Sequence, residues 1–203
     1  MNESFDITIV GAGLAGTALA CALSSAGSST SAPLRIALIE AKAIKNDWPA
    51  CDEGIHGFDP RVSALTVASQ AFLTDIGVWP AMTQQRVSPF EKMHVWDADG
   101  TGEVSFDAAD VRAAVLGHIV ENRVTLAALV NHLKQSANIQ IFDGQAVTHL
   151  HLPEKPEDES PQLILEDGTV IRSTLIVAAD GANSPLRELA GITVREWPYD
   201  HDA

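Results

Sequence analysis

Cysteines, basic residues and long hydrophobic runs are all scarce in this sequence, and each scarcity excludes a class of protein. The two cysteines, Cys21 and Cys51, are isolated, so they form no disulfide framework and favour a reducing compartment such as the cytoplasm. No grouping of His, Cys, Asp and Glu has the spacing of a metal site, so no metal is expected. With 13 Lys and Arg against 27 Asp and Glu, the net charge of -14 argues against nucleic-acid binding. No stretch of about 18 apolar residues occurs, so no membrane-spanning helix is predicted.

The composition is otherwise that of a folded domain. Hydrophobic residues make up 46% of the chain and charged residues 20%, which is ample for a core and ordinary for a globular protein. The first residues carry no basic segment, and glycines interrupt their apolar run, so no signal peptide is predicted.

The first forty residues have the pattern of a strand, a glycine-rich turn, a helix and a second strand. Asp6–Val10 is short, apolar and β-branched, as is typical of a strand buried in a parallel sheet. Gly11–Gly16 follows, and an Ala/Leu-rich helix is predicted from there to about Ser25. After a loop, Leu34–Glu40 is a second apolar strand that ends on an acidic residue. The pattern predicts a βαβ unit and therefore an α/β fold with a parallel sheet.

The rest of the chain contains two predicted helices and several short strands. The helices are predicted at Val62–Ile76, which Gly77 would end, and at Val124–Ala137. The strands are predicted at Met93–Trp96, Gly102–Phe106, Ile139–Phe142, Ala146–Leu152, Gln162–Leu165 and Thr169–Ala178, with a tight turn at Asp167-Gly168 and an exposed hairpin tip at Pro153–Pro161. The late strands predict an antiparallel excursion from the parallel sheet.

The glycine-rich turn matches the dinucleotide-binding pattern G-x-G-x-x-G. It consists of Gly11, Ala12, Gly13, Leu14, Ala15 and Gly16. The first glycine of this pattern allows the tight turn, the second lets a pyrophosphate approach the backbone, and the third lets the helix pack on the strand. Glu40 closes the second strand, where an acidic side chain accepts hydrogen bonds from ribose hydroxyls. The pattern predicts a dinucleotide site but does not separate FAD from NAD.

A second segment favours FAD. Leu175–Arg187 contains the string ADGANSPLR, an apolar strand followed by Asp-Gly and a polar turn into a helix. In this string the chain resembles the flavoprotein monooxygenases of the para-hydroxybenzoate hydroxylase type. The resemblance implies that Asp180 and Gly181 face the ribityl and pyrophosphate groups of the flavin. The alternative is that Asp180 only caps the following helix.

Three further strings resemble the ubiquinone-biosynthesis branch of that family. Phe58–Leu65 (FDPRVSAL) resembles the segment whose arginine reaches the flavin phosphate and ribityl region, which implies this role for Arg61. The alternative for this arginine is a surface ion pair. Leu116–Arg123 (LGHIVENR) resembles the block in which a polar side chain contacts the flavin, and Asn122 falls at that position. Val95–Asp107 (VWDADGTGEVSFD) resembles the octaprenylphenol hydroxylases.

The resemblance covers nearly the whole chain but only the amino-terminal half of a family member. It implies a truncated, Rossmann-like FAD-binding domain at residues 1–191 and the start of the substrate-domain sheet at residues 192–203. In the family, the third flavin motif and most of the substrate-binding sheet would follow Ala203.

The activity implied by the resemblance is hydroxylation of an aromatic ring with FAD, NAD(P)H and O2. The substrate would be a small aromatic molecule, a polyprenylated phenol in ubiquinone biosynthesis. Such a substrate implies peripheral contact with the inner membrane or with a ubiquinone-biosynthesis complex. No residue is identified as catalytic, because the cofactor carries the chemistry. Two alternatives stay open: an amine or 2-hydroxy-acid oxidase with the same FAD domain, and an inactive FAD-binding fragment.

Overall fold

The computed structural model describes residues 2–26, 33–45, 47–49, 57–153, 159–195 and 197. The chain forms two compact units, one made of Met1–Ile44 with Ala137–Ala203 and the other of Lys45–Ser136. Cys51 and the centre of the predicted hairpin tip at 153–161 lie outside the described residues. The predicted division at residue 191 stays a prediction.

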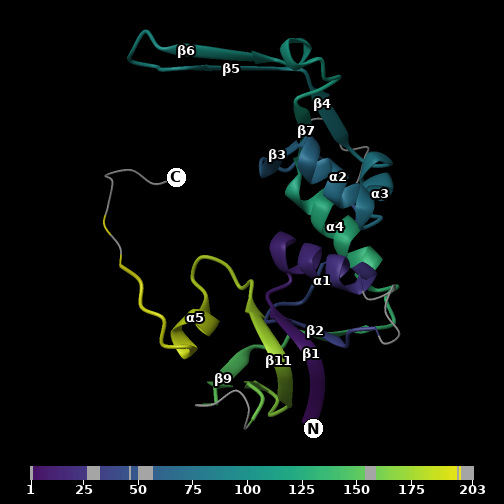
Figure 1. The fold of residues 1–203 in the computed structure, drawn as a ribbon, viewed down its shortest axis with the longest axis vertical. Helices are drawn as coiled ribbons and strands as arrows, with labels where there is room; N and C mark the ends of the chain where they lie inside the picture. The colour runs from purple at the N-terminus through teal and green to yellow at the C-terminus, as the bar shows by residue number, and fades with distance from the viewer. Residues whose placement is uncertain are drawn as a thin grey trace. The chain divides into compact units, whose positions relative to one another are not determined.

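The first unit is built on a six-stranded sheet with the strand order β8-β2-β1-β11-β10-β9. The strands are β1 (Asn2–Val10), β2 (Ile36–Glu40), β8 (Ile139–Asp143), β9 (Val147–His151), β10 (Gln162–Leu165) and β11 (Val170–Ala178). Figure 1 shows β11 beside β1. Strands β8, β2, β1 and β11 are parallel, whereas β10 and β9 are antiparallel. The structure confirms the predicted parallel sheet with an antiparallel excursion.

Helix α1 (Leu14–Ala26) connects β1 to β2 and completes the predicted βαβ unit. The parallel strands end at one edge of the sheet, where Val10 pairs with Ala178 and with Ile39, and Glu40 pairs with Asp143. In open α/β sheets, ligands bind at the carboxyl ends of the strands. This edge is therefore the place to look for a site.

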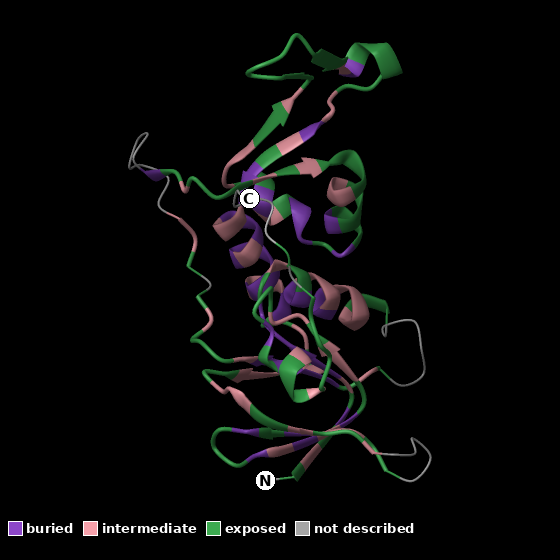
Figure 2. Ribbon diagram, turned by 90° about the vertical axis from the view of Figure 1, so that its left-hand side faces the viewer, coloured by how far each residue is buried: buried purple, intermediate pink, exposed green. Residues whose placement is uncertain are grey.

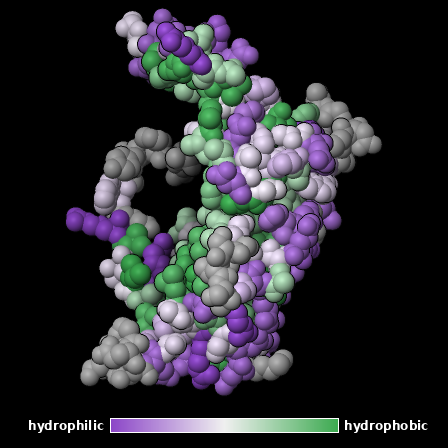
Figure 3. Space-filling view, turned by 45° about the vertical axis from the view of Figure 1, so that its right-hand side comes forward, coloured by the Kyte–Doolittle hydropathy of each residue, from purple (hydrophilic) through white to green (hydrophobic). Residues whose placement is uncertain are grey.

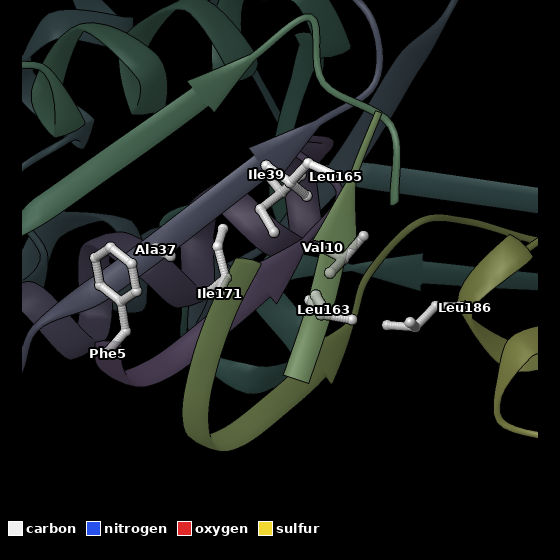
Figure 4. Close-up of a cluster of buried hydrophobic side chains, with 8 residues drawn as sticks. All are labelled: Phe5, Val10, Ala37, Ile39, Leu163, Leu165, Ile171 and Leu186. Atoms are coloured by element: carbon white, nitrogen blue, oxygen red, sulfur yellow. The ribbon is translucent and has the colours of Figure 1, made fainter. Parts of the chain in front are cut away.

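One buried cluster of the first unit joins the sheet to a short helix. It receives residues from β1, β2, β10 and β11, and Leu186 from the short helix α5 (Pro185–Leu189). Figure 4 shows its buried members, which are Phe5, Val10, Ala37, Ile39, Leu163, Leu165, Ile171 and Leu186. Burial of one large aliphatic or aromatic side chain contributes about 1.5–3 kcal/mol, so this cluster holds the strand ends and α5 in fixed positions.

In its described residues, the second unit combines three α-helices with two small antiparallel sheets. The helices are α2 (Val67–Asp75), α3 (Trp79–Thr83) and α4 (Asn122–Leu133), and the three-stranded sheet has the order β3 (Val62–Thr66), β7 (Gly117–Glu121), β4 (Val87–Phe90). Among the described elements of this unit, helix α4 carries the largest share of buried side chains, among them Val124, Leu129 and Leu133. Because β7 runs directly into α4, this core also fixes the junction between them.

The prediction of one helix over Val62–Ile76 is wrong in its first part. Val62–Thr66 is strand β3, which pairs with β7, and the helix begins only at Val67. Thr66 separates the two elements, because its Oγ1 accepts a hydrogen bond from the N–H of Ser69 and caps the helix. The helix ends before Gly77, whose φ of 79° is the left-handed conformation expected of a terminating glycine.

A two-stranded hairpin extends from the second unit. It consists of β5 (Lys92–Trp96) and β6 (Glu103–Asp107), followed by the 3-10 helix η3 (Ala108–Val111), and it confirms the strands predicted there. Figure 2 shows this hairpin as exposed. At the top of Figure 3, where the hairpin lies, hydrophobic and hydrophilic residues are mixed; the exposed hydrophobic ones include Met93, Trp96 and Phe106.

Candidate cofactor-binding site

Two of the three motif glycines are required by the packing of the chain itself. Gly11 has a φ of 104°, and a Cβ atom there would lie 2.2 Å from the carbonyl oxygen of Ala179. A Cβ on Gly16 would lie 1.9 Å from the carbonyl oxygen of Gly11. The turn after β1 is therefore packed tightly between the end of β11 and the first turn of α1.

Gly13 is different, because nothing in the described part of the chain requires a glycine there. A Cβ built on Gly13 has no described heavy atom within 4 Å, and its φ is outside the left-handed region. The residue is exposed and immediately precedes α1. Helix amino-terminal N–H groups attract anions, so the open space at Gly13 fits a pyrophosphate that approaches the backbone.

Glu40 is held against the glycine-rich turn. Its Oε2 accepts a hydrogen bond from the N–H of Ala12 over 2.7 Å, and its Oε1 accepts one from the N–H of Lys42 over 3.1 Å. Each carboxylate oxygen can accept more than one hydrogen bond. The carboxylate is thus fixed in orientation and retains capacity for ribose hydroxyls, as the prediction for Glu40 requires.

Asp180 lies at the same edge of the sheet, after β11. Its Oδ2 accepts a hydrogen bond from the N–H of Leu186 over 3.0 Å, whereas Ser184 caps α5 by accepting from the N–H of Arg187. The capping alternative for Asp180 therefore accounts for one of its oxygens. The other, Oδ1, is buried and has no hydrogen-bond partner among the described residues. A buried oxygen of this kind is costly unless a further group satisfies it, so Asp180 fits a ligand-binding role. The neighbouring Gly181 has a φ of 90° and open space at its α-carbon.

A cavity of about 270 Å³ lies at this edge of the sheet, close to the lower end of the range of about 300–1,000 Å³ that is usual for ligand sites. Gly11, Glu40 and Asp180 all line it. So does Gln145, for which the sequence predicted no role. Its Oε1 is buried and, like Oδ1 of Asp180, has no hydrogen-bond partner in the described part of the chain. Its position shortly after the predicted strand Ile139–Phe142 is the signal that could have identified it, because parallel strands end at a common edge.

Leu14 and Ala15 of the motif form the start of α1, whereas the predicted residues Arg61 and Asn122 lie in the second unit and are next to each other. The N–H of Asn122 donates to the carbonyl oxygen of Arg61 over 3.0 Å, and Oδ1 of Asn122 accepts from the hydroxyl of Ser63 over 2.5 Å. The side chain of Arg61 is 81% exposed and forms an ion pair with Asp59 over 3.5 Å. The surface ion pair considered as an alternative is therefore present. An exposed pair at that distance is weak, so it leaves the guanidinium available to an anionic ligand.

The carboxylate of Asp59 also accepts a hydrogen bond from the backbone N–H of Arg61. The pKa of its carboxyl group lies below the ordinary value, first because the backbone N–H of Arg61 donates to it and then because the Arg61 guanidinium contacts it. Arg123, which follows Asn122, points instead to Glu121 and to the carbonyl oxygen of Gly57. The structure thus brings Arg61 and Asn122 together within one unit and Glu40 and Asp180 together within the other.

Comparison with known proteins identifies relatives of this chain. The sequence model of the family described as "FAD binding domain" matches residues 4–200. The 3-demethoxyubiquinol 3-hydroxylase of Escherichia coli (strain K12) is 34% identical over 198 residues, which cover 98% of this chain and 46% of that protein. The mitochondrial ubiquinone biosynthesis monooxygenase COQ6 of Danio rerio is 33% identical over 207 residues, which cover 100% of this chain and 41% of that protein.

A solved structure shares the fold. A variant of PqsL from Pseudomonas aeruginosa superposes with a TM-score of 0.75 at 20% sequence identity, covering 97% of this chain and 48% of that one. The chain thus spans less than half the length of each relative named here.

Proposed function

The chain belongs to the FAD binding domain family, and on that premise we propose that it holds FAD for an NAD(P)H- and O2-dependent monooxygenase that hydroxylates aromatic rings. The proposed substrate is a polyprenylated phenol of ubiquinone biosynthesis. The names of the Escherichia coli and Danio rerio relatives, a 3-demethoxyubiquinol 3-hydroxylase and a ubiquinone biosynthesis monooxygenase, support this choice.

The observation that carries the proposal is the arrangement of residues at the carboxyl edge of the first-unit sheet. Glu40 is fixed by Ala12, Gly13 has open space, and Oδ1 of Asp180 lacks a partner in the described part of the chain. In the proposed complex, Glu40 accepts hydrogen bonds from the ribose of the adenosine half. The turn Gly11–Gly16 provides N–H groups for the pyrophosphate, and Asp180 with Gly181 binds the ribityl side.

Bound FAD would supply the redox chemistry by accepting a hydride equivalent from the nicotinamide and activating O2 for transfer of one oxygen atom to the ring. The chain's own residues would bind and orient it. Arg61 would place its guanidinium against an anionic group of the flavin half, and Asn122 would offer its side-chain amide. No residue of the chain is assigned a proton transfer.

The partners and the location follow from the substrate in this proposal. A polyprenylated phenol resides in a membrane, so contact with the inner membrane, or with other proteins of the pathway, would be peripheral. Among the described residues, no helix has both the length and the apolar character needed to span a bilayer.

The proposal is tested by incubating the FAD-loaded chain with NAD(P)H, 18O2 and a polyprenylated phenol. Mass spectrometry should find one 18O atom in a hydroxylated product. Peroxide produced from an amine or a 2-hydroxy acid without NAD(P)H would favour the oxidase alternative. Bound FAD without any turnover would support the other alternative, a binding fragment that is inactive alone.

A further inference from the structure

Glu121 is a buried carboxylate to which neither the sequence motifs nor the proposed function assigns a role. It is the last residue of β7 and its side chain is 4% exposed. Two guanidinium groups lie against it, Arg86 with Nε at 3.0 Å from Oε1, and Arg123 with a terminal nitrogen at 2.7 Å from Oε2. A buried ion cluster contributes little net stability, because desolvation offsets the attraction, so a role beyond stability is worth seeking.

Both arginines also hold the segment that precedes Arg61. Arg86 donates to the carbonyl oxygen of Gly57 over 3.1 Å, and Arg123 donates to the same oxygen. The Arg86 guanidinium also lies over the ring of Phe58, with its carbon 4.5 Å from the ring centroid. Gly57 and Phe58 are thereby fixed by side chains that Glu121 orients.

Glu121 also contacts Asp59, the residue that follows Phe58, directly. Its Oε2 accepts a hydrogen bond from the N–H of Asp59 over 2.8 Å. The carboxylate of Asp59 in turn accepts from the N–H of Arg61 over 2.8 Å and forms the ion pair with its guanidinium. A continuous series of contacts therefore runs from the buried carboxylate to the exposed arginine.

We infer that Glu121 is a positioning residue: with Arg86 and Arg123, it fixes residues 57–61 so that Arg61 presents its guanidinium to an anionic group of the cofactor. The inference rests on the proposed function, because it requires FAD to be the ligand of Arg61. Orientation of this kind increases affinity because the backbone of residues 57–61 need not be ordered on binding.

A double-mutant cycle on FAD affinity tests the inference. The dissociation constant is measured by flavin fluorescence for the full chain, for Glu121→Gln, for Arg61→Gln and for the double variant, with circular dichroism to verify folding. Arg61→Gln should weaken binding by about 10-fold, the loss of one charge-assisted contact, and Glu121→Gln by a comparable factor. The double variant should bind no more weakly than Arg61→Gln alone, because Glu121 acts through Arg61. Glu91→Gln, an exposed carboxylate of the same unit, should leave the affinity unchanged.

Asp59→Asn provides a second route if Glu121→Gln does not fold. Asp59 belongs to the segment 57–61. Its replacement by Asn removes the charge that pairs with Arg61, while the backbone N–H of residue 59 can still donate to Glu121. Its effect on FAD affinity should likewise vanish in the Arg61→Gln background. A loss that adds in full to that of Arg61→Gln would overturn the inference, since a merely structural role has no such dependence.

The outcomes separate the inference from the function on which it rests. If the unchanged chain is folded and does not bind FAD, the proposed function and the inference are both overturned. If it binds FAD and Glu121→Gln leaves the affinity unchanged, the inference alone is overturned. If Arg61→Gln leaves the affinity unchanged, the inference is overturned together with the role proposed for Arg61, while the proposal that the chain binds FAD stands.

Discussion

Oε2 of Glu40 accepts a hydrogen bond from the backbone N–H of Ala12 over 2.7 Å. This contact joins the end of β2 to the turn that follows β1, two places that are far apart along the chain. It orients the carboxylate beside the same cavity that Gly11 and Asp180 line. The acidic residue and the glycine-rich turn therefore form one structure rather than two separate motifs.

Replacement of Glu40 by Gln should weaken FAD binding by about 10-fold or more. A neutral amide can still accept from the N–H of Ala12, but it loses the charge that strengthens hydrogen bonds from ribose hydroxyls, which are worth about 1.5–3 kcal/mol when one partner is charged. Calorimetric titration of FAD into both forms measures the difference. Glu166→Gln, an exposed carboxylate in the same unit, is the matched control and should bind FAD as the unchanged chain does. Equal affinities for all three forms would remove Glu40 from the site.

The motif glycines should separate into one that serves the fold and one that serves the ligand. Gly16→Ala places a Cβ against the carbonyl oxygen of Gly11 and should lower the free energy of unfolding by about 1–3 kcal/mol. Gly13→Ala places its Cβ in open space and should change the free energy of unfolding by no more than about 1 kcal/mol, while weakening FAD binding. Urea unfolding without FAD and a FAD titration give the two quantities. The reverse pattern would contradict the assignment of Gly13 to the pyrophosphate.

Asp180→Asn should reduce FAD affinity by about 10-fold with little change in thermal stability. The amide oxygen can keep the hydrogen bond from the N–H of Leu186, but an NH2 group replaces the buried oxygen that lacks a partner among the described residues. Thermal unfolding and fluorescence titration of the variant measure the two effects. A large loss of stability with unchanged affinity would mean that Asp180 only supports α5.

The thiol of Cys21 should be unreactive in the folded chain. Burial raises its pKa from 9.0 to about 12, so at pH 8 only on the order of one thiol in 10⁴ is ionised, and the thiolate is the reactive form. Iodoacetamide labelling at pH 8, followed by mass spectrometry of the Cys21 peptide, should find modification in guanidinium chloride but not in buffer. Equal labelling in both would show that α1 is not packed as described.

The parts of the fold that the sequence predicted are those set by local pattern. Buried apolar runs around Gly11–Gly16 predicted the βαβ unit, and Asp167-Gly168 predicted a tight turn that the structure contains, with Gly168 at a φ of 83°. Val62–Thr66 was predicted as helix because apolar residues recur there at helical spacing. Its strand conformation depends on pairing with β7, which is distant in sequence and therefore invisible to a local pattern.

Prediction of the site from the sequence is limited in the same way, to residues that a local pattern can place. Glu40 and Asp180 follow apolar strands, so their place at one edge of a parallel sheet could be predicted. The role of Glu121 could not, because its contacts come from Arg86, Asp59 and Arg123, and only the folded chain brings the first two to it.

The measurement that tests the central claim most directly is a FAD titration of the folded chain beside its Gly13→Glu variant. The added carboxylate would occupy the open space before α1, where the pyrophosphate is proposed to bind. Gly102→Glu, a change of equal charge at an exposed glycine that also has open space, is the control. The account predicts saturable binding by the unchanged chain and by Gly102→Glu, and its loss in Gly13→Glu. Binding that survives Gly13→Glu unchanged, or a folded chain that binds no FAD, would contradict it.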